Sequence, residues 1–198
     1  MEKYPKRILI SLILLCSIVI CSSVSVFAAS KTLFSSLQVQ EKTNWCWASV
    51  ARQNGYWWAN YNEPITSYPR TQTDIVIHVK GGIVNQGANG SEQVDANKYG
   101  AYDHSKANLT AGTGSLSYST IKAYIEQGKP LAVTQVYNDL SSAHNILVTG
   151  YSDGTGYQNV VYCDPFDGNK YTMSYTTFCN GWMPNYFWGY SVYWWNWS

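Results

Sequence analysis

The sequence predicts an α+β domain in which helices come first and an antiparallel sheet follows. Segments with helix caps and glycine stops fill the first two thirds of the chain. After Pro130 the chain changes to short runs rich in Val, Tyr and Thr, separated by Ser, Asp and Gly clusters. The chain has no internal repeat and no proline-rich linker, so we expect one domain over residues 30–198.

Residues 1–29 are expected to be a secretory signal peptide and not part of the fold. A basic start, "MEKYPKR", precedes a long apolar run, and "VFAAS" supplies small residues for cleavage before Ala29 or Ser30. The alternative is an uncleaved membrane anchor, because the apolar run is nearly long enough to span a bilayer. The signal predicts a secreted or cell-envelope-associated bacterial protein without stable membrane insertion after cleavage.

The first elements after the signal are expected to be an extended segment and a helix. Residues 31–44 lead into "WCWASVARQNGYWWAN", residues 45–60, which indicates a helix. Asn44 or Thr43 can cap this helix, and its alanines favour it. The next segment, "TDIVIHVKGG", is either a second helix or a short strand, and its glycines end it.

A polar, glycine-rich stretch over residues 83–114 is expected to be a loop with one short helix, Ser91–Tyr99. The following segment, "SLSYSTIKAYIEQG", predicts a further helix. It has a serine-rich start, apolar Ile121 and Ile125 four residues apart, and Gly128 as its stop.

The second part of the chain is expected to form the sheet. Its β-rich runs are "LAVTQVY", "HNILVTGYS", "YQNVVYCD" and "NKYTMSY", each bounded by turn residues. "SYTTFCNGW" indicates a helical turn, and the aromatic "FWGYSVYWWNW" indicates a closing strand. These runs are short and follow one another directly, so an antiparallel arrangement is expected.

The composition argues against a nucleic-acid partner, because the formal net charge is only +1. Aromatic residues are frequent, at 16%, while charged residues make up 13%. Two interpretations of the aromatic surplus stay open: the rings fill the core of a β-rich domain, or they form a surface that touches polymers, peptides or cell wall. We expect a monomer.

Three cysteines lie outside the signal: Cys46, Cys163 and Cys179. An odd number in an exported protein leaves one unpaired or bonded elsewhere. Either Cys163 and Cys179 form a disulfide that leaves Cys46 free, or they are buried thiols that act as small hydrophobes. There is no CxxC spacing, so neither a metal site nor a cofactor is expected.

Cys46 is the first candidate for chemistry. It falls in the first turn of the expected helix, where unpaired N–H groups and the helix dipole favour a thiolate. A nearby histidine would complete the activation, and the chain has three. His78 lies in an apolar run and is interpreted as a core or edge residue, whereas His104 lies in a polar loop. His144 opens a β run and can point into a cleft from a rigid strand.

Two further residues fit this set. Asp164 ends the run "VVYCD", and a hairpin between this strand and the His144 strand would bring its carboxylate beside the imidazole. The alternative is that Asp164 and the following proline only make a turn. Gln40 lies six residues before Cys46, where its amide can stabilise an oxyanion together with the cysteine backbone N–H. Its alternative is an ordinary polar surface residue.

The ordered motifs "Q-x5-C-W-A-S", "H-N-I-L-V-T-G-Y" and "V-V-Y-C-D-P" resemble those of the papain-like cysteine peptidases. The similarity is greatest to the branch that contains the bacteriocin-leader-processing peptidases and the secreted AvrRpt2-type effectors. It runs from Gln40 to about Phe178, although residues 63–114 match only in length. The sequence departs from the family in lacking a glycine before the histidine in "SSAH" and in having Cys163 beside Asp164.

The resemblance implies a papain-like fold, with helices packed against a C-terminal antiparallel sheet, and a role for each candidate residue. Cys46 would be the nucleophile, His144 the general base and acid, Asp164 the orienting group and Gln40 an oxyanion donor. The sequence therefore predicts an exported cysteine endopeptidase that acts on peptides or proteins. Two alternatives stay open: an acyl transferase or amidase with the same residues, and a non-hydrolytic module that binds cell-wall or carbohydrate ligands.

Overall fold

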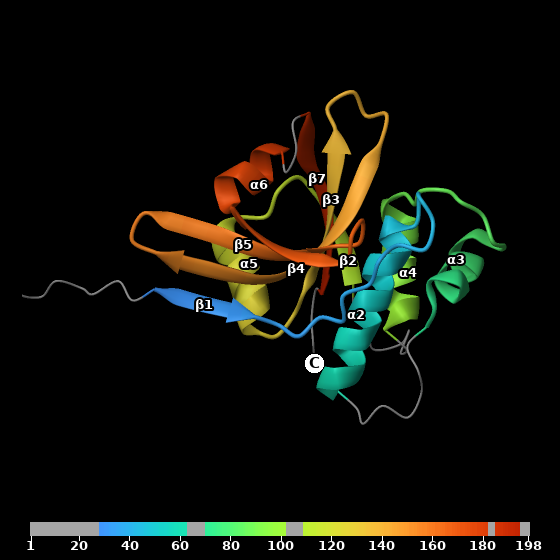
Figure 1. The fold of residues 1–198 in the computed structure, drawn as a ribbon, viewed down its shortest axis with the longest axis horizontal. Helices are drawn as coiled ribbons and strands as arrows, with labels where there is room; N and C mark the ends of the chain where they lie inside the picture. The colour runs from blue at the N-terminus through green and yellow to red at the C-terminus, as the bar shows by residue number, and fades with distance from the viewer. Residues whose placement is uncertain (1–27, 63–69, 102–108, 182–184, 195–198) are drawn as a thin grey trace, which may run out of the picture.

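The computed structural model describes residues 28–62, 70–101, 109–181 and 185–194. These residues form five helices and a seven-stranded antiparallel sheet, which confirms the predicted α+β class (Figure 1). The expected signal peptide, apart from its last two positions, lies outside the described residues. Among the described helices, none combines the length and the apolar character needed to cross a bilayer.

Three of the described helices begin with a capping side chain, whereas no such cap is seen at the helix that starts with Cys46, where Asn44 or Thr43 was expected. An N-terminal capping box formed by Thr71 and Asp74 begins the helix that contains "TDIVIHVK", so the segment with two open interpretations is helical. Gly81 ends it with a φ of 74°, a left-handed conformation that glycine adopts without strain. The helices are α2 (Cys46–Asn62), α3 (Gln72–Lys80), α4 (Gly90–Gly100), α5 (Tyr118–Glu126) and α6 (Tyr175–Gly181).

The sheet is built around one long strand. The first half of β4 pairs with β3 and its second half pairs with β1, while β5 runs antiparallel along its other side. The order along the sheet is β2-β7-β3-β4-β5-β6, with β1 attached to β4. The strands are β1 (Ala29–Thr32), β2 (Leu109–Thr113), β3 (Leu131–Tyr137), β4 (Ala143–Gly154), β5 (Tyr157–Asp164), β6 (Asn169–Ser174) and β7 (Tyr186–Trp194).

One strand lies where the sequence predicted a loop. β2 falls in the glycine-rich stretch over residues 83–114, and it forms because Leu109–Thr113 pairs with β7. Local composition does not favour this strand, since glycine weakens strands, and the pairing comes from a segment about 80 residues away in the chain. Tertiary contact therefore overrides the local signal.

The helices and the sheet meet along α2. Figure 1 shows α2, α3 and α4 gathered at one end of the sheet, with α5 against the strands. The main core lies between the sheet, α2 and α5, and a second apolar cluster joins α2, α3 and α4. All tryptophans whose side chains are described are buried, so these rings belong mainly to the core: Trp45, Trp47, Trp57, Trp58 and Trp188.

A segment that we call the strap, residues 33–45, connects β1 to α2 and so joins the sheet to the helical part. The buried Gln72 amide of α3 bonds the strap backbone on either side of Gln40, at 2.7 and 2.9 Å. The Gln40 N–H in turn donates to the carbonyl of Pro165 at 2.7 Å, just after β5 ends. The strap thus fixes the start of α2 relative to the end of β5.

Two glycines allow α2 and α4 to approach closely. A Cβ on Gly55 would lie 2.2 Å from the carbonyl oxygen of Gly100, and one on Gly100 would lie 2.4 Å from the carbonyl oxygen of Ala51. Both contacts are with backbone atoms, which cannot rotate away. The crossing of these helices therefore requires glycine at both positions.

We predict that Gly55→Ala destabilises the protein by about 2 kcal/mol or more, because the overlap outweighs the roughly 1 kcal/mol gained from replacing a helical glycine. Urea denaturation measures the change in the free energy of unfolding. Gly82→Ala is the matched control, since nothing lies within 4 Å of the added Cβ and its φ is ordinary. A Gly55→Ala protein as stable as the control would contradict the proposed close crossing.

Candidate active site

Cys46 is the first residue of α2 and is held there by its neighbours. Trp45 and Trp47 are both 1% exposed. Their indole N–H groups donate to the carbonyls of Val84 at 2.7 Å and Gln86 at 3.0 Å. These anchored rings fix the first turn of the helix, and the thiol between them stays partly exposed. Cys46 is therefore a free thiol on a rigid helix start.

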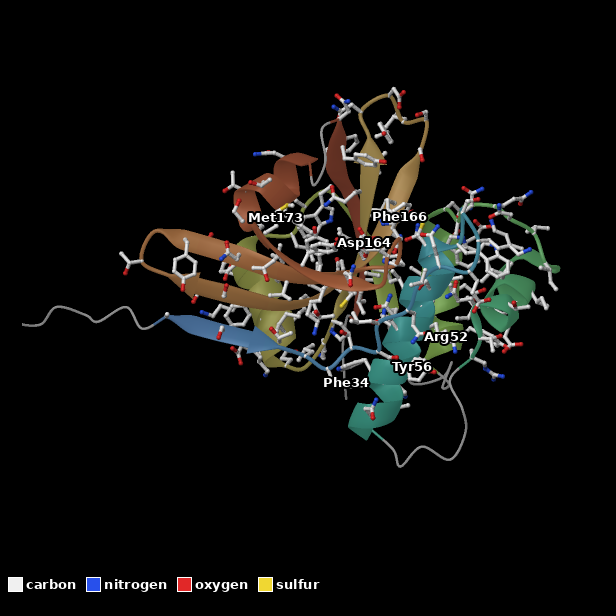
Figure 2. The ribbon with its side chains drawn as sticks, in the orientation of Figure 1. Phe34, Arg52, Tyr56, Asp164, Phe166 and Met173 are labelled. Atoms are coloured by element: carbon white, nitrogen blue, oxygen red, sulfur yellow. The ribbon has the colours of Figure 1, made fainter. Side chains whose placement is uncertain are left out.

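His144 and Asp164 come from the two strands of one hairpin. β4 and β5 pair as expected, with Leu147 opposite Cys163. His144 Nε2 lies 2.7 Å from Asp164 Oδ1, and the same oxygen accepts the backbone N–H of Phe166 at 2.8 Å. Figure 2 shows Asp164 and Phe166 where the end of β5 meets the helical part. Two donors thus fix the carboxylate that orients the imidazole.

The surroundings of His144 set its protonation state. Burial lowers the pKa of its ring, but the hydrogen bonds to Asp164 and to Cys46, and the electrostatic interactions with these two groups, raise that pKa more strongly, to about 9. Because Nε2 bonds the carboxylate, the other ring nitrogen, Nδ1, is left for the thiol. His144 therefore keeps a proton at neutral pH between a carboxylate and a sulfur.

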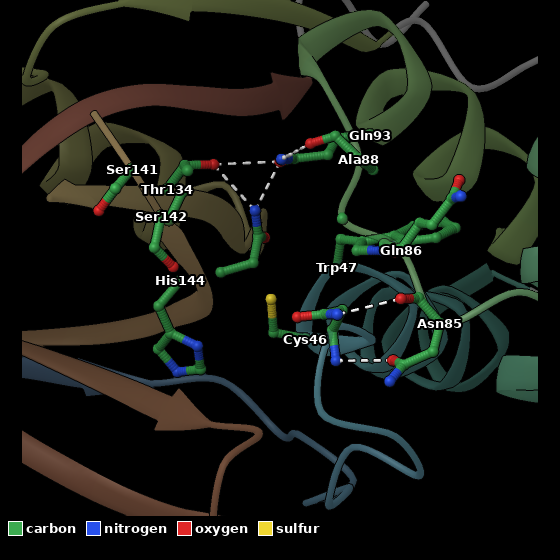
Figure 3. A pocket seen from close by; sticks show the side chains of 14 residues that line it. Cys46, Trp47, Asn85, Gln86, Ala88, Gln93, Thr134, Ser141, Ser142 and His144 are labelled. Atoms are coloured by element: carbon green, nitrogen blue, oxygen red, sulfur yellow. Dashed lines mark hydrogen bonds between the residues drawn. The ribbon is translucent and has the colours of Figure 1, made fainter.

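Cys46 and His144 line one pocket of about 410 Å³ from opposite sides (Figure 3). Cys46 comes from the helical part and His144 from the sheet, so the pocket lies at the boundary between them. The loop before α4 forms a further wall, and the turn between β3 and β4 forms another. A thiol and a protonated imidazole at the edge of an open pocket can carry out acyl transfer on a bound carbonyl compound.

Gln40 lies near this group but does not line the pocket. Its Nε2 donates to the carbonyls of Lys42 at 3.1 Å and Thr43 at 2.8 Å, in the turn before Cys46. Its Oε1 is buried and has no hydrogen-bond partner among the described residues. The structure thus brings Cys46, His144 and Asp164 together, whereas the Gln40 amide bonds the backbone of residues 42 and 43, so its oxyanion role remains a prediction.

The other cysteines and histidines lie away from the pocket. Cys163 and Cys179 are free thiols, so the disulfide considered from the sequence does not form; Cys163 Sγ lies 3.1 Å from Ser35 Oγ of the strap. His78, expected in the core or at an edge, is exposed on α3, where it stacks on a tyrosine and pairs with an aspartate. His104 lies outside the described residues.

Sequence reasoning missed a set of buried polar residues in the pocket. Gln93, Thr134 and Asn145 are at most 4% exposed and hydrogen-bond to one another. One signal was present: Asn145 interrupts an otherwise apolar run directly after His144. In the described part of the chain, no three His, Cys, Asp or Glu side chains come together to hold a metal ion.

A helical part that carries a cysteine and an antiparallel sheet that carries a histidine–aspartate pair, facing across a pocket, define the papain-like class of cysteine peptidases. The sequence model of the family described as "Papain-like cysteine protease AvrRpt2" matches residues 28–183. The chain belongs to this family of cysteine peptidases, which are hydrolases. The family predicted from the motifs is thus confirmed.

A solved structure shares the fold. It is a mite-allergen structure from work on the limited antibody cross reactivity between Blo t 1 and Der p 1. It matches with a TM-score of 0.51 at 11% identity and covers 82% of this chain. The match spans only 66% of the length of the allergen chain, and at this identity it shows the fold alone. A search of curated proteins gave no match.

We predict that an NMR titration of the His144 ring gives a pKa of about 9, and that Asp164→Asn lowers this pKa towards the ordinary value of 6.5. The variant removes the carboxylate that holds the proton, while burial still opposes the charge. Because the folded-state pKa lies above the unfolded one, the stability that His144 contributes is complete below pH 6.5 and is lost as the pH rises through 9.

Asp167→Asn is the control for this titration. It makes the same charge change three residues further on, at a carboxylate that bonds Asn169 and Tyr171 and not the imidazole. The account requires the control to leave the pKa of His144 nearly unchanged. Equal shifts in the two variants would mean that the pKa reports the general field and not the bond to Asp164.

Proposed function

We propose that this protein is an exported cysteine endopeptidase in which Cys46 is the nucleophile, His144 the acid and base, and Asp164 the group that orients the imidazole. The observation that carries the proposal is the continuous set of contacts from Asp164 through His144 to Cys46 at the edge of the pocket. Membership in a family of cysteine proteases supports the same chemistry.

The proposed reaction follows from where the proton lies. Cys46 Sγ attacks the carbonyl carbon of a bound peptide, and the carbonyl oxygen takes the negative charge. The bond to the leaving amine breaks as His144 transfers its proton to the amine nitrogen, which leaves a thioester on Cys46. A water molecule then gives a proton to His144 and attacks the thioester. The carboxylic acid leaves, and the thiolate and imidazolium are restored.

Hydrogen-bond donors must stabilise the negative charge on the carbonyl oxygen. The backbone N–H of Cys46 is one candidate, since the first N–H groups of a helix have no partner within the helix. We propose the Gln40 side-chain amide as the second. It would have to turn Nε2 away from the carbonyls of Lys42 and Thr43, which it bonds in the structure. Gln72 bonds the strap backbone at Val39 and Glu41, on either side of Gln40, so we expect the side chain of Gln40 to turn without a shift of its backbone.

We further propose that residues 1–29 direct the chain out of the cell and that residues 30–198 act as a monomeric domain on peptide or protein substrates. The support is the basic, apolar and small-residue pattern of the first segment. Two alternatives use the same scaffold: transfer of the acyl group to an acceptor other than water, and binding of cell-wall or carbohydrate ligands without catalysis. The burial of the described tryptophans favours catalysis over binding.

We predict that Cys46→Ala lowers kcat/KM by at least about 10⁴-fold while the melting temperature stays within a few degrees of that of the wild type, because the thiol forms the intermediate and is only partly buried at the edge of the core. Peptide cleavage, followed by mass spectrometry, measures the loss. The same spectra separate hydrolysis from transfer, since transfer or deamidation yields cross-linked products or a change of about +1 Da.

Cys179→Ala serves as the control, since it removes a half-buried thiol away from the pocket. This variant should retain turnover. Peptidase activity that survives Cys46→Ala would exclude the mechanism. A wild-type protein that binds cell wall but neither cleaves peptides nor reacts with iodoacetamide would favour the binding module.

We predict that Gln40→Ala lowers kcat by about 10²- to 10³-fold with little change in KM, since an oxyanion donor acts mainly in the transition state. Steady-state kinetics on a cleavable peptide measures both constants. Gln38→Ala is the control: this strap residue has the same side chain, and its amide bonds Ser36 and the backbone. If both variants lose activity equally, the effect comes from the strap conformation and not from an oxyanion contact.

A further inference from the structure

Several polar side chains of the pocket are already paired with one another. Gln93, Thr134 and Asn145 hydrogen-bond among themselves and are almost fully buried. The hydroxyl of Ser141 donates to an aspartate of its own turn. A substrate would have to break these bonds to use the same groups, so they are poor candidates for its recognition.

Asn44 differs from these residues, because it is exposed and lines the pocket two positions before the cysteine. Its backbone N–H donates to Asn85 Oδ1 at 3.0 Å, and its Nδ2 group donates to the backbone carbonyl of Asn85 at 3.0 Å. Figure 3 draws both bonds at Asn85. Asn85 Nδ2 in turn donates to Thr43 Oγ1 at 2.8 Å. One asparagine of the loop between α3 and α4 thus holds two residues of the strap.

These bonds fix the direction of the Asn44 amide. A backbone carbonyl can only accept, so Nδ2 must face the carbonyl of Asn85, and reversing the amide would place two oxygens together. Oδ1 therefore points away from that carbonyl, and it accepts no hydrogen bond from the described residues. The pocket thus contains an oriented acceptor on an exposed residue close to the nucleophile.

A peptide backbone offers the donor that this acceptor needs. Of the fourteen residues that line the pocket, none is Asp, Glu, Lys or Arg, so nothing there selects a charged group. A backbone N–H is an uncharged donor that every residue except proline carries. Because Asn85 already holds the Asn44 amide, little side-chain freedom is lost when a donor binds to it.

We propose that Asn44 Oδ1 accepts a backbone N–H of the peptide substrate within two residues of the scissile bond, and that Asn85 is the positioning residue that orients this oxygen. The Cα atoms of Asn44 and Cys46 can lie at most about 7 Å apart, which is the length of about two residues of an extended peptide. The inference rests on the proposed peptidase function and specifies which group of its substrate is bound.

The test uses a cleavable peptide that mass spectrometry identifies from a mixed peptide library. In each of a set of versions, one backbone amide within two residues of the scissile bond is replaced by an ester, which removes the N–H and nearly keeps the shape. For one of these versions, kcat/KM of the wild type should be about three- to tenfold lower than for the parent peptide, the effect of one neutral hydrogen bond. Mass spectrometry checks that the same bond is cut.

Asn44→Leu removes the acceptor and keeps the approximate size of the side chain, so the parent-to-ester ratio of that version should fall towards one. Asn60→Leu is the matched control and should keep the wild-type ratio. Asn60 is also exposed, and its Nδ2 also donates to a backbone carbonyl, that of Tyr56 at 2.8 Å, but it does not line the pocket.

Asn85→Ala is the second variant, in case Asn44→Leu does not fold. It removes the side chain that bonds the Asn44 N–H and Thr43 but leaves the backbone carbonyl in place, so the ratio should fall by a smaller factor. The ratio separates recognition from a merely structural effect, which lowers kcat/KM for all peptides alike.

Two results would overturn the inference and leave the peptidase function intact. One is wild-type protein that cleaves every ester version as fast as the parent peptide. The other is a folded Asn44→Leu protein that keeps the wild-type ratio for every version. Wild-type protein that cleaves no peptide in the library would overturn the proposed function and the inference with it.

Discussion

The hydrogen bond between His144 Nε2 and Asp164 Oδ1 is the interaction on which the rest of the site depends. Burial alone would lower the pKa of His144. The carboxylate opposes burial, and it also fixes which ring nitrogen faces Cys46. Asp164 itself accepts a hydrogen bond from the Phe166 N–H. The turn after β5 therefore positions the carboxylate, the carboxylate positions the imidazole, and the imidazole faces the thiol.

The proposed catalytic groups come from two parts of the fold, and separate contacts join these parts. The strap bonds the end of β5 through the Gln40 N–H and the Pro165 carbonyl. A hydrogen bond from Thr134 of β3 to Gln93 joins the sheet to α4. The glycines where α2 and α4 cross let the backbones of the two helices approach closely. The geometry of the site therefore depends on polar contacts that do not involve the reacting atoms.

The sequence predicted the class, most elements and the family because those signals are local. The β-rich runs that form β3, β4 and β5 and the serine-rich start of α5 lie within single segments, and Cys46, His144 and Asp164 lie at or near element ends. β2 could not be predicted, since its pairing partner is β7. The hydrogen bonds of Gln40, and those among Gln93, Thr134 and Asn145, could not be predicted either, because they depend on contacts between distant segments. The same contacts decide which buried polar atoms remain unpaired.

The central claim is that Cys46 and His144 meet across the pocket and act on a bound carbonyl as one unit. A crystal structure of the protein treated with a peptide aldehyde tests it most directly. The account predicts a covalent bond from Cys46 Sγ to the aldehyde carbon, with Nδ1 of His144 in hydrogen-bonding reach and Nε2 still on Asp164. An unmodified Cys46, or an adduct from which His144 has turned away, would contradict it.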